Sequence, residues 1–362
     1  MFTKKALEQA DACRFCWMCR HVCPVGQVTG KESNNARAKG FLVSMDGRGA
    51  KLDETSMEIM YECALCKACT NDCATGYDPA IFILEARTKA VVDGLVPPNV
   101  QPVIDRAMAG CMYAEAEDTG LAAVIAKLPE KADVAVYLGP VARRKQPVIG
   151  MALLSLLEKA GVSYTALREE PQSGADLGDL VGYVEDVKKA AEKCAAALKE
   201  TGAGTIVVLD ENDAVFMKHQ WAEWGIECGQ IVTATSCIAS LIKDGKLKPA
   251  AVELTACYHD PARIARDLEE WEPARAIIVA MGIELHELFH NKKGTKSTGG
   301  GMLHQTSPVI AAQVAEARMN DIRFAEESVV ITSTPTAFDN LSSLGAEDVE
   351  VKDLFILLND AC

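Results

Sequence analysis

Two short cysteine-rich runs set the organisation of the chain. The first reads Cys13-Arg-Phe-Cys16-Trp-Met-Cys19-Arg-His-Val-Cys23-Pro24, and the second reads Cys63-Ala-Leu-Cys66-Lys-Ala-Cys69-Thr-Asn-Asp-Cys73. Both follow the pattern C-x2-C-x2-C-x3-C, so eight of the 14 cysteines fall in two compact segments. Zinc ribbons use cysteine pairs separated by a longer stretch, and disulfides are rare in cytosolic proteins. The two runs therefore favour iron–sulfur ligation, with zinc and disulfides as the weaker alternatives.

The spacing within each run is typical of loops that hold [4Fe–4S] clusters. Three cysteines at intervals of three wrap one corner of a cubane, and the fourth points toward the other cluster. We therefore expect one cluster on Cys13, Cys16, Cys19 and Cys73, and the other on Cys63, Cys66, Cys69 and Cys23. Pro24 follows the first run, whereas Ala74 follows the second, which weakens one turn without removing a ligand.

The segments around the cysteines have helical patterns. Helices are expected at residues 34–44, 54–62 and 79–93, the last ending at Gly94 with Pro97-Pro98 beyond it. Loops between helices hold the cysteines, and residues 19–26 read Cys-Arg-His-Val-Cys-Pro-Val-Gly. Both features resemble the helical ferredoxin module of the iron–sulfur subunits of succinate dehydrogenase and anaerobic glycerol-3-phosphate dehydrogenase. We therefore predict an α-helical dicluster ferredoxin domain at residues 1–110, followed by a linker at 111–131.

Charge and hydropathy exclude several classes of protein. The net charge is −14, and residues 1–110 carry 13 basic and 13 acidic side chains, so the whole acidic excess lies in residues 111–362. A nucleic-acid partner is not expected, because the chain lacks the excess of lysine and arginine that binds the phosphate backbone. No apolar run reaches the roughly 18 residues of a membrane span, and residues 1–12 lack the apolar core of a signal peptide. We expect a cytoplasmic protein that meets a membrane only through a partner.

From residue 132 onward, short β-rich segments alternate with helical ones. Such alternation predicts an α/β architecture with mainly parallel strands, so the fold class of the whole chain is α + α/β. Strands are expected at residues 133–138, 162–167, 205–209, 230–233, 251–254, 277–281, 283–285, 329–332 and 349–351, and helices at 149–159, 186–200 and 309–320. A weak repeat with a period near 110 residues divides this half into 132–248 and 249–362.

These two repeats resemble the cysteine-rich CCG modules of heterodisulfide reductase catalytic subunits and of the iron–sulfur subunits of glycolate oxidase and lactate-utilisation systems. The cysteines of those modules are missing here. The corresponding positions read Gly139-Pro140, Gln172-Ser173-Gly174 and Asp210 to Asp213 in the first repeat, and Ala262, Ser297-Thr298 and Thr334-Pro335-Thr336-Ala337 in the second. Hydroxyls and carboxylates do not replace several soft thiolates at an iron–sulfur cluster, so we expect degenerate CCG-like repeats without a cluster of that type.

Three further motifs and six cysteines are interpreted as structural. His286-Glu-Leu-Phe-His290 matches the zinc-protease motif H-E-x-x-H but follows a strand-like segment rather than lying on a helix. The glycine-rich segment 294–301 lacks the Walker order, and His259-Asp260-Pro261 is interpreted as a helix start with Asp260 as the cap. The remaining cysteines are expected to pack in the core: Cys111, Cys194, Cys228, Cys237, Cys257 and Cys362.

The sequence predicts two clusters but no set of nucleophile, base and orienting residue. We therefore predict an electron-transfer subunit of an oxidoreductase complex. The family resemblance implies an FAD-containing dehydrogenase partner that oxidises a hydroxy acid or polyol, and an electron-transfer flavoprotein, ferredoxin or quinone-linked acceptor. The alternatives are a divergent heterodisulfide or thiol reductase whose catalytic centre lies in the second half, and a structural adaptor whose clusters only stabilise the fold. No catalytic residue is expected in this chain under the first hypothesis.

Overall fold

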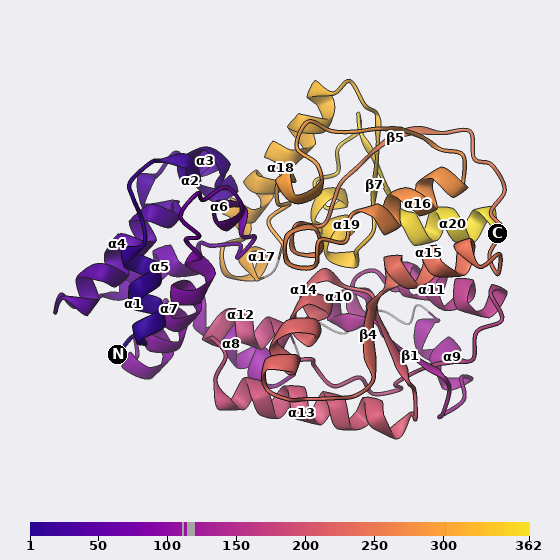
Figure 1. Ribbon diagram of the computed structural model, residues 1–362, viewed down its shortest axis with the longest axis horizontal. Helices are drawn as coiled ribbons and strands as arrows, with labels where there is room; N and C mark the ends of the chain where they lie inside the picture. Colours follow the sequence, from indigo (N-terminus) through magenta and orange to yellow (C-terminus); the bar gives the residue numbers. More distant parts are fainter. Residues whose placement is uncertain (111, 114–119, 301) are drawn as a thin grey trace.

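The computed structural model describes residues 1–110, 112–113, 120–300 and 302–362. It shows an N-terminal helical lobe beside a larger body of helices and two parallel sheets (Figure 1). Cys111, Gly301 and part of the predicted linker at 111–131 lie outside the described residues. The elements of the lobe are α1 (Lys4–Asp11), α2 (Met18–Val22), α3 (Pro24–Thr29), η1 (Glu32–Asn34), α4 (Ala36–Gly47), α5 (Glu54–Tyr61), α6 (Ala68–Asn71), α7 (Pro79–Asp93) and α8 (Gln101–Met108).

Helix α7 is the central helix of the lobe, and its sequence accounts for both of its ends. The Asp78 side chain accepts a hydrogen bond from the backbone N–H of Ala80, and Pro79 occupies the first turn, where its missing N–H costs nothing. Gly94 adopts a left-handed conformation at the C-terminus with φ +67°. The predicted helix at residues 79–93 is thus confirmed with the same bounds.

The body contains two four-stranded parallel sheets of identical topology. Their strand orders are β2-β1-β3-β4 and β6-β5-β7-β8, so each sheet is built from one continuous part of the chain. The strands are β1 (Val134–Tyr137), β2 (Tyr164–Ala166), β3 (Thr205–Val208), β4 (Gln230–Thr233), β5 (Thr255–Tyr258), β6 (Glu284–His286), β7 (Val329–Thr332) and β8 (Glu350–Asp353). Parallel strands need crossover connections, and the intervening helices supply them.

The helices of the body lie between and beside these strands. Those of the first sheet are α9 (Leu121–Ala126), α10 (Gly139–Arg144), α11 (Pro147–Lys159), α12 (Ala175–Val181), α13 (Glu185–Glu200), α14 (Glu211–Phe216), η2 (Met217–Trp221) and α15 (Ala234–Lys243). Those of the second sheet are η3 (Ile264–Leu268), α16 (Glu272–Ala280), η4 (Lys292–Gly294), α17 (Leu303–Thr306), α18 (Pro308–Phe324), α19 (Pro335–Ser342) and α20 (Leu354–Ala361). Within the described part of the chain, no helix is both long and apolar enough to cross a membrane.

Two of the predicted strands are wrong. Residues 277–280 belong to helix α16 and Met281 is its C-cap; Ile277, Ile278 and Met281 are buried, while Val279 is 69% exposed. That burial follows helical spacing, and a short apolar run does not by itself distinguish a buried helix from a strand. The strand predicted at 251–254 instead lies at Thr255–Tyr258, where Ala256, Cys257 and Tyr258 are buried and Thr255 is exposed.

The lobe is joined to both halves of the body by apolar packing and by a buried arginine. Val25 and Ala64 of the lobe share a core cluster with Ala262 and Val314 of the second half. Arg87, only 2% exposed, donates from Nη1 to the backbone carbonyl of Asp179 in the first half at 2.5 Å. The cysteine runs are therefore held in a fixed position against the body.

Candidate functional site

The two cysteine runs adopt the same unusual backbone. In each run, two non-glycine residues have positive φ: Phe15 (54°) and Trp17 (70°) in the first, and Leu65 (49°) and Lys67 (55°) in the second. Such residues cost on the order of 1–2 kcal/mol each and persist where the surrounding structure holds them. The tight coil points backbone N–H groups at sulfur, from Phe15 to Cys13 and from Leu65 to Cys63, both at 3.4 Å. A strained turn repeated in both runs is typical of a functional loop.

The fourth cysteine of each run lies in a different local structure. Cys23 caps helix α3, since its Sγ accepts from the N–H of Gly26 at 3.4 Å and Pro24 opens the helix. Cys73 enters a turn, with its Sγ 3.2 Å from Thr75 Oγ1, and that hydroxyl reaches the carbonyl of Ala12 beside Cys13 at 3.4 Å. The helix after the first run and the turn after the second match the difference between Pro24 and Ala74.

One small cavity is lined by cysteines of both runs. Its wall includes Cys63, Cys66 and Cys69 of the second run and Cys23 of the first. Cys73 does not line this cavity. Its Sγ contacts the hydroxyl of Thr75, which in turn donates to the carbonyl of Ala12 at the start of the first run. The structure thus brings each fourth cysteine near the other run, which is the exchange expected of a two-cluster fold.

Lys39 tests whether this cavity suits an iron–sulfur cluster. The side chain lines the cavity and is 1% exposed, and its Nζ donates to the carbonyl of Asn34 at 2.7 Å. Among the described residues, no carboxylate forms an ion pair with it. A buried ammonium requires a nearby negative charge, which four thiolates or the anionic cluster they hold would supply. The residues present therefore fit a [4Fe–4S] cluster, whose chemistry is to take up and release one electron.

Lys39 is a functional residue that was not predicted from the sequence, although its position in the helix carries a signal. It lies in helix α4 with buried Ala36 three residues before it and buried Val43 four residues after it. These positions share one helical face, so a lysine stands on the side that faces the core. A charged residue on a predicted apolar face is a mark of a functional environment.

Arginines hold the loop of the second run in place. Arg87 donates to the carbonyl of Cys63 at 2.8 Å, and Arg266 of the second half donates to the carbonyl of Cys66 at 2.6 Å. Lys67 forms an ion pair with Asp267, which is also in the second half. This loop is therefore braced by groups about 200 residues away in the sequence.

The thiols that line the small cavity resist ionisation when they carry no metal. Burial raises the pKa of Cys23 to about 11, against the opposing effect of Lys39, and burial also raises the pKa of Cys66 and Cys69. Burial also acts on Cys73, but hydrogen bonds from Thr75 and neighbouring backbone N–H groups outweigh it and lower that pKa. Because iron binds thiolates, cluster binding must displace protons from the buried set.

The first run lies at the surface. Cys16 is exposed, and so are its neighbours Phe15 (58%), Trp17 (41%) and Met18 (46%). Arg37 lies over the Trp17 ring at 3.5 Å and holds it in place. The two runs thus differ in depth at their second cysteine, since Cys16 is exposed and Cys66 is buried, while the other six cysteines are half-buried.

Several of the positions at which the resemblance to CCG modules predicts cysteine lie close together. Asp210, after β3, accepts from both the N–H and the hydroxyl of Thr336, at 3.1 and 2.7 Å. Ser173 Oγ lies 2.5 Å from Asp213 Oδ1, and a Cβ on Gly139 would lie 2.7 Å from Asp213 Oδ2. These carboxylates and hydroxyls are already partnered with one another, and they do not fit an iron–sulfur cluster.

Glu211, next to Asp210 in this polar cluster, makes the stability of the protein depend on pH. Burial raises the pKa of Glu211 from 4.5 to about 7. The stability that the protonated form contributes is full below pH 4.5 and is lost as the pH rises through 7. We expect the free energy of unfolding to fall between about pH 5 and pH 8 by on the order of 2–3 kcal/mol more in the natural chain than in Glu211→Gln.

Anaerobic urea unfolding of both proteins at the two pH values measures this difference. His259, whose pKa is lowered by burial and by Arg318, acts in the opposite sense but is common to both proteins. Equal pH dependence of the two proteins would contradict the prediction.

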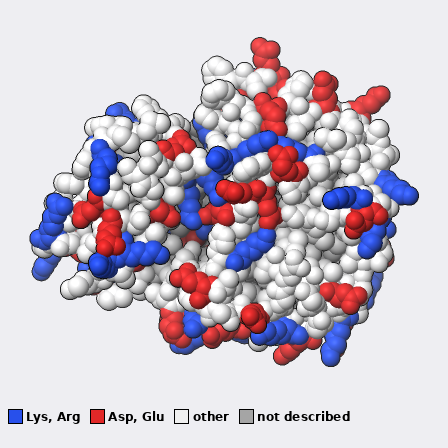
Figure 2. All heavy atoms as spheres, viewed as in Figure 1, with Lys and Arg blue, Asp and Glu red and all other residues white. Residues whose placement is uncertain are grey.

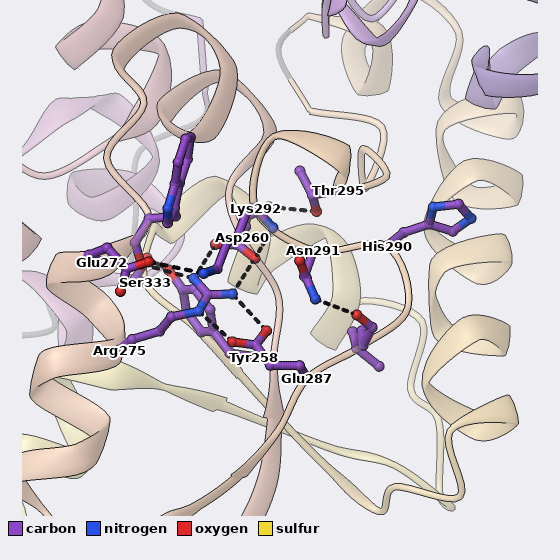
Figure 3. Close-up of polar contacts among 12 residues, drawn as sticks. Tyr258, Asp260, Glu272, Arg275, Glu287, His290, Asn291, Lys292, Thr295 and Ser333 are labelled. Carbon is purple, nitrogen blue, oxygen red and sulfur yellow. Dashed lines mark hydrogen bonds and ion pairs between the residues drawn. The ribbon is translucent and has the colours of Figure 1, made fainter. Parts of the chain in front are cut away.

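The histidine motifs have structural partners (Figure 3). Glu287 of the H-E-x-x-H segment forms an ion pair with Arg275, and His290 points away from that pair. His286 ends strand β6 and lies 2.5 Å from Glu327, so the two histidines do not share a helical face. No group of three or more His, Cys, Asp or Glu side chains forms a single-ion site within the described ranges.

The helix cap predicted at Asp260 is wrong. Its carboxylate accepts from both Nη atoms of Arg275, at 2.7 and 2.9 Å, and from the N–H of Lys292 at 2.8 Å (Figure 3). A bidentate guanidinium binds a carboxylate more strongly than a single backbone N–H does, and Arg275 is a long-range neighbour that the local pattern did not reveal. His259 is buried and accepts from Arg318 through Nδ1 at 3.1 Å.

The cysteines outside the two runs divide by burial. Cys194, Cys228 and Cys257 are buried, as predicted, and Cys237 is half-buried against the core. The prediction that Cys362 packs in the core is wrong, because this last residue is exposed.

Comparison with known proteins agrees with this geometry. Residues 9–77 match the family described as a 4Fe-4S dicluster domain. One of the subunits of the dihydromethanophenazine:CoB–CoM heterodisulfide reductase of Methanosarcina acetivorans is 26% identical over 99% of this chain and 95% of its own length. The glycolate oxidase iron–sulfur protein of Escherichia coli, also a subunit, is 20% identical over 93% of this chain and 91% of its own.

Two further proteins are similar over parts of their own length. The EtfAB:quinone oxidoreductase of Syntrophomonas wolfei is 23% identical, covering 89% of this chain and 52% of that protein. The crystal structure of a hypothetical protein from Helicobacter pylori shares the fold with a TM-score of 0.62 at 11% identity, covering 99% of this chain and 73% of that one. The chain therefore carries two [4Fe–4S] clusters in an N-terminal dicluster domain and is a homologue of the iron–sulfur electron-transfer subunits of oxidoreductases.

Proposed function

We propose that an inner cluster is held by Cys23, Cys63, Cys66 and Cys69, and an outer cluster by Cys13, Cys16, Cys19 and Cys73. The shared cavity, the buried ammonium of Lys39 and the repeated strained turns support this division. The difference in depth gives the two clusters different surroundings, and solvent exposure and hydrogen bonds are what set cluster potentials.

We infer that the chain relays electrons between an FAD-containing dehydrogenase subunit and a downstream acceptor. The oxidation of a hydroxy acid or polyol would take place on the partner's flavin. The acceptor would be an electron-transfer flavoprotein, a ferredoxin or a quinone-linked protein. The observation that carries this function is the pair of cysteine sets at different depths, the outer one beside exposed Phe15, Trp17 and Met18. Exposed aromatic side chains next to a redox centre are suited to docking a partner.

The body has the role of a scaffold in this proposal. Residues 132–248 and 249–362 correspond to two degenerate CCG-like repeats that follow a linker at 111–131. Their facing edges are closed by partnered polar groups such as Asp210 with Thr336, and Arg87 and Arg266 anchor the inner loop to them. In this proposal the facing edges of the two halves support the clusters.

Iron analysis and redox titration of anaerobically purified protein test the function. We expect about eight iron and eight sulfide ions per chain, and two centres that are reduced and reoxidised in an EPR-monitored titration. A clear excess of iron, or reduction of a disulfide substrate by the chain alone, would instead support the reductase hypothesis. Clusters that never change oxidation state would contradict both hypotheses.

A further inference from the structure

A cleft of about 660 Å³ opens between the lobe and the first half of the body. Helix α7 forms one wall with Ile81 and Leu84, and Tyr183, Phe216 and Trp224 form the other. This volume is in the range of sites that enclose a small organic ligand. No sequence motif and no residue of the proposed cluster sites accounts for it.

Three aromatic rings form one wall of the cleft. The centroids of Tyr183 and Phe216 are 5.4 Å apart, those of Phe216 and Trp224 are 5.8 Å apart, and all three pairs meet edge to face. Phe216 is 2% exposed, whereas Tyr183 is 37% exposed and Trp224 is half-buried. The buried ring thus supports two rings that remain open to a planar ligand, which stacks well on aromatic side chains.

Several charged groups around the cleft are paired within the protein, whereas Lys5 and Glu223, which also line it, form no ion pair with any described residue. Glu85 accepts from the N–H and hydroxyl of Thr3, at 2.8 and 2.5 Å, and Lys89 binds Asp93 at 2.6 Å. Lys67 binds Asp267. On the face of the molecule in Figure 2, basic and acidic side chains are likewise interspersed. An uncharged ligand suits such a wall better than a phosphorylated one, because a phosphate would need several unpaired basic groups close together, and Glu223 offsets the charge of Lys5.

The cleft adjoins the loop of the inner cysteines. Leu65 and Lys67 line the cleft, and Cys66 stands between them in the sequence. Lys67 also lines the cavity that contains Cys23, Cys63, Cys66 and Cys69. One strained loop therefore separates the inner cluster site from the cleft, so a ligand bound there would be next to the otherwise buried cluster.

We propose that this cleft binds a planar, uncharged, redox-active ring of the quinone or isoalloxazine type. The inference rests on the proposed electron-transfer function and names the place where the inner cluster meets a small carrier. A quinone becomes its quinol by taking two electrons and two protons. The inner cluster would pass on the two electrons one at a time, being re-reduced between them through the outer cluster by the dehydrogenase partner, and the two protons would come from solvent in the open cleft.

Equilibrium dialysis of the two-cluster protein against 2-methyl-1,4-naphthoquinone and, separately, riboflavin tests the site. We expect saturable one-to-one binding of one of the two rings, and the ring that binds identifies the class of carrier. The double variant Tyr183→Ala/Trp224→Ala should bind at least about tenfold more weakly. The conservative double variant Tyr183→Phe/Trp224→Phe should retain binding, and so should Phe324→Ala, which removes an aromatic ring that is 90% exposed elsewhere.

Iron content of each variant separates this inference from the proposed function. Weaker binding with about eight iron ions still present supports the cleft, because it shows that the clusters and the fold have survived. Saturable binding of neither ring, or equal binding by the natural chain and the alanine double variant, would overturn the inference while leaving the two-cluster function intact.

Discussion

Replacing Cys23 with alanine is expected to remove the same cluster as replacing Cys66. Both side chains line one cavity with Cys63 and Cys69, although Cys23 is only four residues from Cys19 in the other run. Each variant should lose about four of the eight iron ions and the same component of the EPR spectrum. Replacing Cys73 should instead remove the component that is lost in Cys16→Ala, because Cys73 is tied to the first run through Thr75 and Ala12.

The measurements are iron and sulfide content and EPR of the dithionite-reduced, anaerobically prepared variants. Cys237→Ala is the matched control, because that thiol is half-buried and lies outside both runs. It should retain both spectral components. Identical spectra for Cys23→Ala and Cys16→Ala would show that each run holds its own cluster, and would overturn the exchange of the fourth ligands.

Loss of Arg263 is expected to be among the most destabilising changes in the body. Its guanidinium binds Asp179 at 2.9 Å and also contacts Asn212, and its backbone N–H donates to Glu211 at 2.9 Å. The side chains of Arg263 and Asp179 are 9% and 2% exposed. Removing one partner of such a pair leaves a buried charge, so Arg263→Met should lower the free energy of unfolding by about 3–5 kcal/mol.

Anaerobic urea unfolding measures the loss of unfolding free energy in Arg263→Met, and a variant that breaks a surface ion pair serves as the comparison. Arg323→Met removes an arginine that binds Asp348 at 2.6 Å, but Asp348 is 57% exposed, and the expected loss is far smaller than in Arg263→Met. Adding Asp179→Asn to Arg263→Met should recover part of the stability, since it removes the unpaired charge. No recovery in the double variant would mean that the loss comes from packing rather than from the carboxylate of Asp179.

The pair formed by Arg263 and Asp179 also connects the proposed scaffold to the inner cysteines. Arg87 of the lobe donates both to the carbonyl of Asp179 and to the carbonyl of Cys63. The chain of contacts therefore runs from the second half, through the first half, to the loop of the second run. Iron content of Arg263→Met at low denaturant would report whether this connection also holds the cluster loop.

Patterns of short range could be predicted from the sequence alone. The spacing of Cys13, Cys16 and Cys19, with its copy at Cys63, identified the dicluster domain because the ligands of a cluster loop are local in the chain. Helix α7 was predicted to the residue, because Asp78, Pro79 and Gly94 act on their own neighbours. Strands with strong β-branched content, such as Val329–Thr332, were predicted equally well.

Features that depend on the packing of distant segments could not be predicted from the sequence. Residues 277–280 are helical because that segment buries one face against the core, and the Asp260 carboxylate binds Arg275 rather than capping a helix. The burial of Lys39, the brace from Arg266 to Cys66 and the aromatic cleft all join segments that are distant in the chain. Such contacts depend on how whole elements pack, since local residue spacing carries no information about which distant side chain will face a given group.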